Sequence, residues 1–385
     1  MSKPKGFEKP TGVKDYVPEA VERLRRIEFR VLDCMKRWGY QQIITPTLEF
    51  YDTVGTASAT TDRKLFKLLD QNGRTLVLRS DMTAPIARVV SSLLKEEPLP
   101  LRLSYHSSVF RAFAEEAGKE SEFFQTGVEL VGDASAEADA EVVALAIASL
   151  EAAGITEFKL AIGHIGFLNG LLEELLPWRN EEQEWLKESL INRDYVGYRR
   201  ILSEIGLTGR SAEKLEGLLA LHGEGGGLEV ARGLTRNAEA QKAVDHLRNV
   251  LEVLDAYGVS DRVLVDLTMV GDFSYYTGMT FEGYASGLGF PVVSGGRYDN
   301  LLSQFGRPAP ATGFAIKTNR IMEWGAAASE QAERTTILYR AAKRREALAQ
   351  AAELRAAGNG VVVTRLVPDG EGLPTVAGNR LMTFE

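Results

Sequence analysis

The sequence predicts an α+β fold with a mostly antiparallel sheet core, a helical insertion and a small C-terminal α/β module. Three observations predict it. The segments 103–111 and 123–131 have the composition of strands and flank a polar stretch, which favours a long antiparallel hairpin. Leucines at helical spacing dominate from about 166 to 257. Strand patterns then return, and strands with helices segregated around them are typical of α+β domains.

The first expected element is an amphipathic helix over residues 18–38. Pro18 suits its first turn and Gly39 suits its C-terminal stop. Cys34, the single cysteine, lies on the apolar side of this helix and is interpreted as core filler, because one cysteine cannot form an intrachain disulfide. The apolar residues that recur at helical spacing are Val21, Leu24, Ile27, Val31 and Trp38.

The remaining core elements follow in chain order. Expected strands cover 40–44, 74–79, 103–111, 123–131, 158–162, 262–268, 279–284 and 290–294. Expected helices cover 136–153, 298–305 and 313–324. Together these predict one core domain, residues 1–325, which contains the helical insertion at about 166–257.

A second, smaller domain is expected after a linker at 325–333. Residues 334–385 read as a strand at 337–339, a helix at 341–357 and a strand at 360–367. This order predicts a small α/β module. A chain of 385 residues, 44% of them hydrophobic, is long enough to give each domain a core.

Composition argues against several classes of function. Forty-five basic and 53 acidic residues give a net charge of −8, which disfavours broad nucleic-acid binding. The polar N-terminus has no apolar signal region, and no apolar run is long enough to span a bilayer, so a cytoplasmic protein is expected. The four histidines lack metal-ligand spacing, and the glycine-rich 223–227 lacks the following Lys-Ser or Lys-Thr of a phosphate-binding loop. We therefore expect no metal site and no cofactor.

Four separated segments carry a recognisable pattern. They are GYQQIITPTLEF at 39–50, LRSDMTA at 78–84, FRAFAEEAGKESEFFQTGVE at 110–129, and the stretch from Tyr275-Tyr276 through GGRYD at 295–299 to Arg320. In this order they resemble histidyl-tRNA synthetase, a class II aminoacyl-tRNA synthetase, over about residues 8–325. The resemblance implies the antiparallel class II core, and the helix at 18–38 with the strand after it resembles the class II dimer interface, which implies a homodimer.

The resemblance also implies a histidine-binding pocket. Carboxylates and hydrogen-bonding groups on adjacent strands suit an ammonium group, and an imidazole needs a partner for each ring nitrogen and a flat surface beside it. Taken singly, such residues are more often packing or surface ion pairs, so the order of the set carries the prediction. The expected histidine-binding residues are Asp81, Thr83, Arg111, Gln125, Glu129, Tyr275 and Tyr276.

The nucleotide chemistry of that family is not retained. The position that matches its catalytic arginine is Gly271, and Asp272 beside it would repel a phosphate. Arg111 is kept, but residues 111–125 hold two basic and four acidic side chains. Near the kept Arg320, Lys317 and Asn319 replace the usual glycine and glutamate. We therefore expect no catalytic residue.

A kept amino-acid pocket without nucleotide chemistry is similar to the synthetase-like regulatory subunits of ATP phosphoribosyltransferase. That resemblance implies a non-catalytic subunit in a hetero-oligomer with the short-form catalytic subunit, required for its activity, and histidine as the small-molecule effector of feedback inhibition in the first step of histidine biosynthesis. About 50 residues after the linker are too few for a full anticodon-binding domain. Asp81 stands where synthetases usually have glutamate, which leaves open whether histidine binds.

Three alternatives stay open on the sequence. An active histidyl-tRNA synthetase would need another cation in place of the lost arginines, and ATP–pyrophosphate exchange would reveal it. A synthetase-like regulator that binds tRNA would show salt-sensitive tRNA binding. An amide-ligating metabolic enzyme on the same fold would need a functional ATP site.

Overall fold

The computed structural model describes residues 6, 8–113, 120–223, 227–269, 276–324, 334–358, 360–375 and 380–385. The chain divides into two compact units, Met1–Gly325 and Ala326–Glu385. The expected linker at 325–333 lies outside the described residues.

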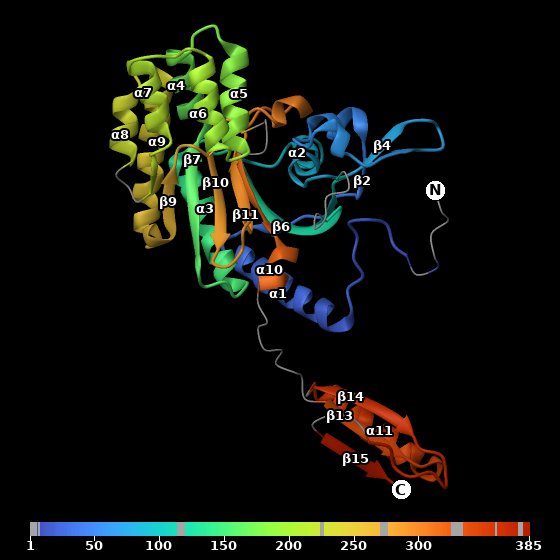
Figure 1. Cartoon of the computed structure of the whole chain (residues 1–385). Coiled ribbons are helices and arrows are strands. Elements are labelled where there is room, and N and C mark those ends of the chain that lie inside the picture. Colours follow the sequence, from blue (N-terminus) through green and yellow to red (C-terminus); the bar gives the residue numbers. More distant parts are fainter. Residues whose placement is uncertain are drawn as a thin grey trace. The chain divides into compact units, whose positions relative to one another are not determined.

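A nine-stranded mixed sheet forms the centre of the first unit, in the order β1-β5-β6-β12-β11-β10-β7-β9-β8 (Figure 1). Neighbouring strands are antiparallel except β1 with β5 and β7 with β9, which are parallel. This architecture confirms the predicted α+β class. The strands are β1 Gln41–Gln42, β5 Leu101–Phe110, β6 Glu122–Val131, β7 Phe158–His164, β8 His222–Gly223, β9 Val263–Asp266, β10 Met279–Ala285, β11 Val293–Arg297 and β12 Ala311–Lys317.

Helix α1 (Pro18–Arg37) packs on α3 (Ala136–Ala152) and on α10 (Thr318–Trp324), and all three pack against this sheet. The first confirms the predicted amphipathic helix, since its apolar residues Leu24, Ile27, Val31 and Met35 are buried. It stops at Gly39, whose φ of 86° is a left-handed conformation that glycine adopts without strain. Cys34 is half-buried against the main core, and burial raises the pKa of its thiol.

A second, three-stranded sheet lies beside α2 (Thr83–Ser92) in the first unit (Figure 1). Its order is β2-β4-β3, and both pairings are antiparallel. The turn between β4 and α2 carries Ser80 and Asp81, so this layer positions one wall of the cavity. The elements are β2 Leu48–Phe50, β3 Lys67–Leu69, β4 Thr75–Leu78 and the short helices η1 Tyr51–Gly55 and η2 Asp62–Lys64.

Six helices occupy most of the segment between β7 and β9 and cluster at one end of the large sheet (Figure 1). The last of them, α9, packs on α3 and α4 and so ties this insertion to the core. The short strand β8 extends the large sheet from within the insertion and was not predicted. The helices are α4 Ile165–Leu175, α5 Asn180–Ile191, α6 Tyr195–Glu204, α7 Arg210–Leu218, α8 Gly227–Leu234 and α9 Ala238–Ala256, and the turn η3 Ser260–Arg262 follows.

One sequence-based expectation was wrong in an important place. The helix predicted over 313–324 is a strand, β12, up to Lys317, and only Thr318–Trp324 is helical. Because β12 lies between β6 and β11 and is buried on both faces, its short apolar run has no alternating pattern that distinguishes it from a helix. The expected helix at 298–305 shrinks to the turn η4 Leu302–Phe305, and the strand expected at 290–294 runs from Val293 to Arg297.

The second unit is a parallel three-stranded sheet in the order β14-β13-β15, with one helix packed against it. The predicted strand, helix and strand are present. The third strand, at the end of the chain, was not predicted. The elements are β13 Arg334–Tyr339, η5 Ala341–Lys343, α11 Arg344–Ala356, β14 Val361–Leu366 and β15 Arg380–Phe384.

Candidate functional site

A cavity of about 770 Å³, counting the part open to solvent, lies at the junction of β6, β10, β11 and β12 with the turn before α2. Six of the seven residues predicted to bind histidine line it, although they come from segments up to 195 positions apart in the chain. The seventh, Tyr275, lies outside the described residues. The six are Asp81, Thr83, Arg111, Gln125, Glu129 and Tyr276.

Glu129 on β6 is the most deeply placed of these groups, with 2% of its surface exposed. Thr83 Oγ1 donates to Glu129 Oε1 at 2.8 Å, and the Tyr298 hydroxyl donates to Glu129 Oε2. Burial penalises the charged carboxylate and raises its pKa to about 8, although both hydrogen bonds act in the opposite direction. At neutral pH the Glu129 side chain is therefore largely protonated. A cationic ligand in the cavity would favour its ionised, carboxylate form.

Asp81 forms the second acidic group of the cavity. The Ala84 backbone N–H donates to Asp81 Oδ1 at 3.0 Å, and the Ser58 hydroxyl donates to Asp81 Oδ2. Asp81 thus occupies the start of α2, where an acidic side chain is favoured by the helix dipole. These contacts fix the direction of its carboxylate and account for its 5% exposure.

Small residues in the neighbouring strands make room for the larger side chains around the cavity. A Cβ at Gly313 on β12 would overlap the Glu129 carboxylate, which faces it across the β6–β12 pair. A Cβ at Gly296 on β11 would lie 2.9 Å from the Tyr276 ring. The glycine pair in the 295–299 motif and Gly313 are therefore required by close packing, since neither Gly296 nor Gly313 has a positive φ.

Replacing Gly313 by alanine is expected to displace the Glu129 carboxylate and to lower the free energy of unfolding by about 1–3 kcal/mol, because the added methyl group has no space. Urea denaturation measures the change. Gly289→Ala is the matched control: a Cβ there meets nothing within 4 Å, so its effect should stay within about 0.5 kcal/mol. Equal stability of the two variants would show that Glu129 is not held as described.

Two basic residues also line the cavity. Lys317, the last residue of β12, faces Gln125 across the β6–β12 pair, and both line the cavity. Arg111, just after β5, also lines it, and its Nε donates to the Ser80 carbonyl at 3.0 Å. Acidic and basic side chains thus line the same cavity.

A second cavity of about 900 Å³ adjoins the first, and Met269, Glu282 and Lys317 line both. Arg193, in the turn between α5 and α6, reaches this region from the insertion, and its Nη2 donates to Glu282 Oε2 at 3.0 Å. The Arg320 guanidinium lies 4.0 Å from the centre of the Phe290 ring, and its Nη1 donates to the Pro291 carbonyl. Arg320, retained from the family motif, is therefore packed against its own chain.

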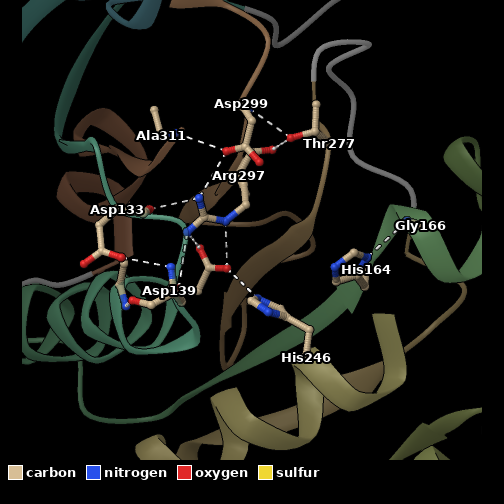
Figure 2. A network of polar contacts seen from close by, with 11 residues as sticks. Asp133, Asp139, His164, Gly166, His246, Thr277, Arg297, Asp299 and Ala311 are labelled. Atoms are coloured by element: carbon tan, nitrogen blue, oxygen red, sulfur yellow. Dashed lines mark hydrogen bonds and ion pairs between the residues drawn. The ribbon is translucent and has the colours of Figure 1, made fainter. Parts of the chain in front are cut away.

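A buried polar network lies on the far side of β11 and joins the core to the insertion (Figure 2). Arg297 Nη2 and Asp139 Oδ1 form an ion pair at 3.0 Å, and the side chains are 5% and 0% exposed. His246 Nε2 on α9 lies 2.7 Å from Asp139 Oδ2. Burial alone would raise the pKa of Asp139, but the hydrogen bond from His246 and the charge of Arg297 hold it below its usual value.

Two residues of the site were not predicted from the sequence. Tyr298 was quoted within the GGRYD motif but not as a partner of Glu129, and Lys317 was noted only as a departure from the family pattern. Tyr298 could have been found only by knowing that the end of β11 lies two strands from β6. The helix predicted over 313–324 hid Lys317, because a helix would not have placed it opposite Gln125.

The described residues contain neither a metal-binding cluster nor a helix that could cross a membrane. No group of three or more histidine, cysteine, aspartate or glutamate side chains is arranged to hold a metal ion in the part of the chain that the structure describes. Among those same residues, no helix combines the length and apolar character needed to cross a membrane.

The sequence of this chain is similar to those of known proteins. Residues 12–321 match the family model described as histidyl-tRNA synthetase. The chain is 48% identical over 369 residues to the ATP phosphoribosyltransferase regulatory subunit of Halalkalibacterium halodurans, covering 95% of this chain and 92% of that protein. The Bacillus subtilis protein of the same name is 44% identical over 363 residues, covering 94% and 92%.

A solved structure is similar over the full length of both chains. It is described as an ATP phosphoribosyltransferase regulatory subunit/histidyl-tRNA synthetase from Bacillus halodurans, with a TM-score of 0.91 and 44% sequence identity. The similarity therefore covers both the core with its cavity and the second unit.

Proposed function

This chain belongs to the family of ATP phosphoribosyltransferase regulatory subunits, which has the histidyl-tRNA synthetase fold, and on that premise we propose that it is a non-catalytic subunit that senses free histidine. It binds histidine in the cavity around Glu129. It also assembles with a separate short-form catalytic subunit, as a homodimer within a hetero-oligomer in the cytoplasm, is required for that subunit's activity, and makes the first step of histidine biosynthesis sensitive to its end product.

The observation that carries this proposal is the set of acidic and hydrogen-bonding groups in one cavity. Asp81 and Gln125 offer acceptors for an ammonium group, and Glu129 can exchange a hydrogen bond with an imidazole nitrogen. The Tyr276 ring supplies an aromatic surface on the same cavity. Aspartate at position 81 is compatible with this role because its carboxylate is fixed by Ser58 and Ala84.

The state of the arginines supports a role without catalysis. Transfer of an adenylyl group needs cations on the phosphates, and one arginine can be worth about 10³-fold or more in phosphoryl transfer. Gly271 and Asp272 occupy the positions at which the synthetase pattern has its catalytic arginine. Arg111 donates to a backbone carbonyl and Arg320 covers Phe290, so each guanidinium is partly engaged within the chain.

Regulation then follows from linkage. Histidine bound to this subunit inhibits the catalytic subunit only if it binds the less active state of the complex more tightly. By the same relation, assembly with the catalytic subunit changes the affinity for histidine by the same factor as histidine changes the assembly equilibrium.

Calorimetric titration of the pure chain is the direct test, and saturable binding of histidine without binding of ATP or tRNA is expected. Asp81→Asn should weaken histidine binding about 10- to 100-fold, because it removes the charge that faces the ammonium group. The control Glu204→Gln alters an exposed carboxylate on α6 and should leave binding unchanged. Adding the catalytic subunit should give phosphoribosyl transfer that histidine inhibits.

Three results would contradict the proposal. Absence of histidine binding would remove the sensing role and leave an activating subunit. ATP–pyrophosphate exchange with histidine would identify an active synthetase. Salt-sensitive tRNA binding would identify a tRNA-binding regulator.

A further inference from the structure

Tyr105 on β5 is a buried tyrosine whose hydroxyl has no hydrogen-bond partner among the residues that the structure describes. It is 1% exposed and lines the same cavity as the candidate histidine-binding residues. The other described tyrosines with at most 3% exposure each donate a hydrogen bond from the hydroxyl, and they are Tyr40, Tyr198 and Tyr298. Because an unpaired buried hydroxyl costs free energy, such a group in a cavity indicates a partner on the ligand.

The strand register and one glycine set the position of this hydroxyl. Tyr105 faces Gly127 across the β5–β6 pair, and a Cβ at Gly127 would lie 2.6 Å from the hydroxyl oxygen. The tyrosine ring therefore extends across β6 at a position that glycine leaves open. Since side chains two residues apart on a strand point to the same face, Gln125 and Glu129 flank the hydroxyl along β6.

Glu129 lies over a second glycine, diagonally across the β6–β12 pair. Gly313 faces Glu129, whereas Gly127 faces Ala315 two residues further along β12. Diagonal neighbours of this kind have Cβ positions about 7 Å apart. Because a Cβ at Gly313 would overlap Glu129 Oε2, the Tyr105 hydroxyl and the carboxylate are separated by on the order of 7 Å. This separation is too long for a direct hydrogen bond and leaves room for a small ring between the two groups.

The protonation state of Tyr105 suits a hydrogen bond to a ring nitrogen. Burial raises the pKa of its hydroxyl well above the usual value, and the charge of Glu129 acts in the same direction. The hydroxyl therefore keeps its proton and can both donate and accept. Glu129 accepts one hydrogen bond on each carboxylate oxygen, from Thr83 and from Tyr298, which leaves further lone pairs for a ligand. The two groups can thus serve opposite edges of one ring.

We propose that Tyr105 is a specificity-determining residue whose hydroxyl hydrogen-bonds one imidazole nitrogen of the ligand while Glu129 bonds the other. This inference deepens the proposed function and rests on it, since it takes histidine to be the ligand. A side chain with a nitrogen at only one edge, or with a methyl group on either ring nitrogen, leaves Tyr105 or Glu129 unpaired. The cavity therefore recognises the side chain of the amino acid at two points.

Tyr105→Phe removes the hydroxyl and keeps the ring, so it should weaken ligand binding without weakening the fold. Calorimetry on the full chain should show histidine binding about 10-fold more weakly, because the buried ring nitrogen loses its partner. Thermal denaturation without ligand should give a melting temperature at least as high as that of the wild type, because the variant no longer buries an unpaired hydroxyl.

The two histidines that carry a methyl group on one or the other ring nitrogen identify the contact. The wild type should bind each of them about 10-fold more weakly than histidine. In Tyr105→Phe, the isomer whose methyl group faces position 105 should bind as tightly as histidine, because the methyl group takes the space of the hydroxyl. The other isomer should keep its disadvantage, because its methyl group faces Glu129.

The matched control is Tyr198→Phe, which removes a buried hydroxyl in the insertion, outside the cavity. That hydroxyl donates to the Leu215 carbonyl at 3.1 Å, so this variant should lower the melting temperature and leave histidine binding unchanged.

Three results for Tyr105→Phe would overturn the inference. They are an unchanged affinity for histidine, an unchanged discrimination against both methylated forms, and a lowered melting temperature, which would show that the hydroxyl has a partner within the chain. Absence of histidine binding by the wild type would instead contradict the proposed function, and the inference would fail with it.

Discussion

Replacing Arg297 by methionine is expected to lower the free energy of unfolding by about 3–5 kcal/mol, the range found when one partner of a buried ion pair is removed. The Asp139 carboxylate is fully buried and would keep only His246 as a partner (Figure 2). Arg297 also donates to the Asp133 carbonyl and to Asp299, so its loss removes further hydrogen bonds. Urea denaturation followed by circular dichroism measures the effect.

Two further variants distinguish the stability effect of this buried ion pair from that of an exposed ion pair. Arg200→Met removes an exposed arginine on α6 that pairs with Glu204 and should change stability by less than about 0.5 kcal/mol. The double variant Asp139→Leu/Arg297→Met should be more stable than Arg297→Met alone, because it leaves no uncompensated charge. A single variant within about 1 kcal/mol of the wild type would contradict the structural role of the pair.

The stability of the ligand-free protein is expected to fall between about pH 5 and pH 8 because of Glu129, and Glu129→Gln should remove this component. The pKa of Glu129 is about 8 in the folded chain against an ordinary value of 4.5. Between these values the unfolded chain loses the proton and the folded chain keeps it, so stability is highest below the lower value and is lost as pH rises through the upper one. The full change is on the order of 5 kcal/mol.

Glutamine imitates the protonated acid, since its amide oxygen can accept from one of the hydroxyls of Thr83 and Tyr298 and its amide N–H can donate to the other. The difference in unfolding free energy between Glu129→Gln and the wild type should therefore be small at pH 5 and grow in favour of the variant toward pH 8.5. Glu204→Gln, at an exposed position, should give a difference that does not change with pH. Parallel pH profiles for the wild type and Glu129→Gln would show that Glu129 titrates normally.

The fold class predicted from the sequence is confirmed, and six of the residues predicted to bind histidine line one cavity, although their binding of histidine stays a prediction. Asp81, Thr83 and Glu129 were grouped by the resemblance to histidyl-tRNA synthetase and the order of its motifs, before any strand pairing was known. The position of β12 did not follow, because a central strand buried on both faces has the same apolar composition as a buried helix. With that strand misassigned, neither Lys317 nor the fit of Gly313 against Glu129 could be derived.

The Arg297–Asp139 pair was not predictable for a different reason. Arginine and aspartate are usually exposed, and these two residues are 158 positions apart. Only the packing of α3 against the sheet brings them together, and α9 of the insertion completes the network through His246. No local sequence pattern indicates that these three residues meet in the folded chain.

Arg297 and Tyr298 are consecutive residues whose side chains bind partners in two different parts of the fold. Arg297 is bound to Asp139 and, through it, to the histidine on α9, whereas Tyr298 donates its hydroxyl to Glu129 in the cavity. Successive side chains of an extended chain point to opposite faces of a sheet, so one peptide unit belongs to both environments. A shift of that unit by about 1 Å exceeds the spread of hydrogen-bond distances, which is roughly 0.5 Å, and could not satisfy both sets of partners. The position of Glu129 in the cavity and the contact of the insertion with the core thus both depend on these two consecutive residues.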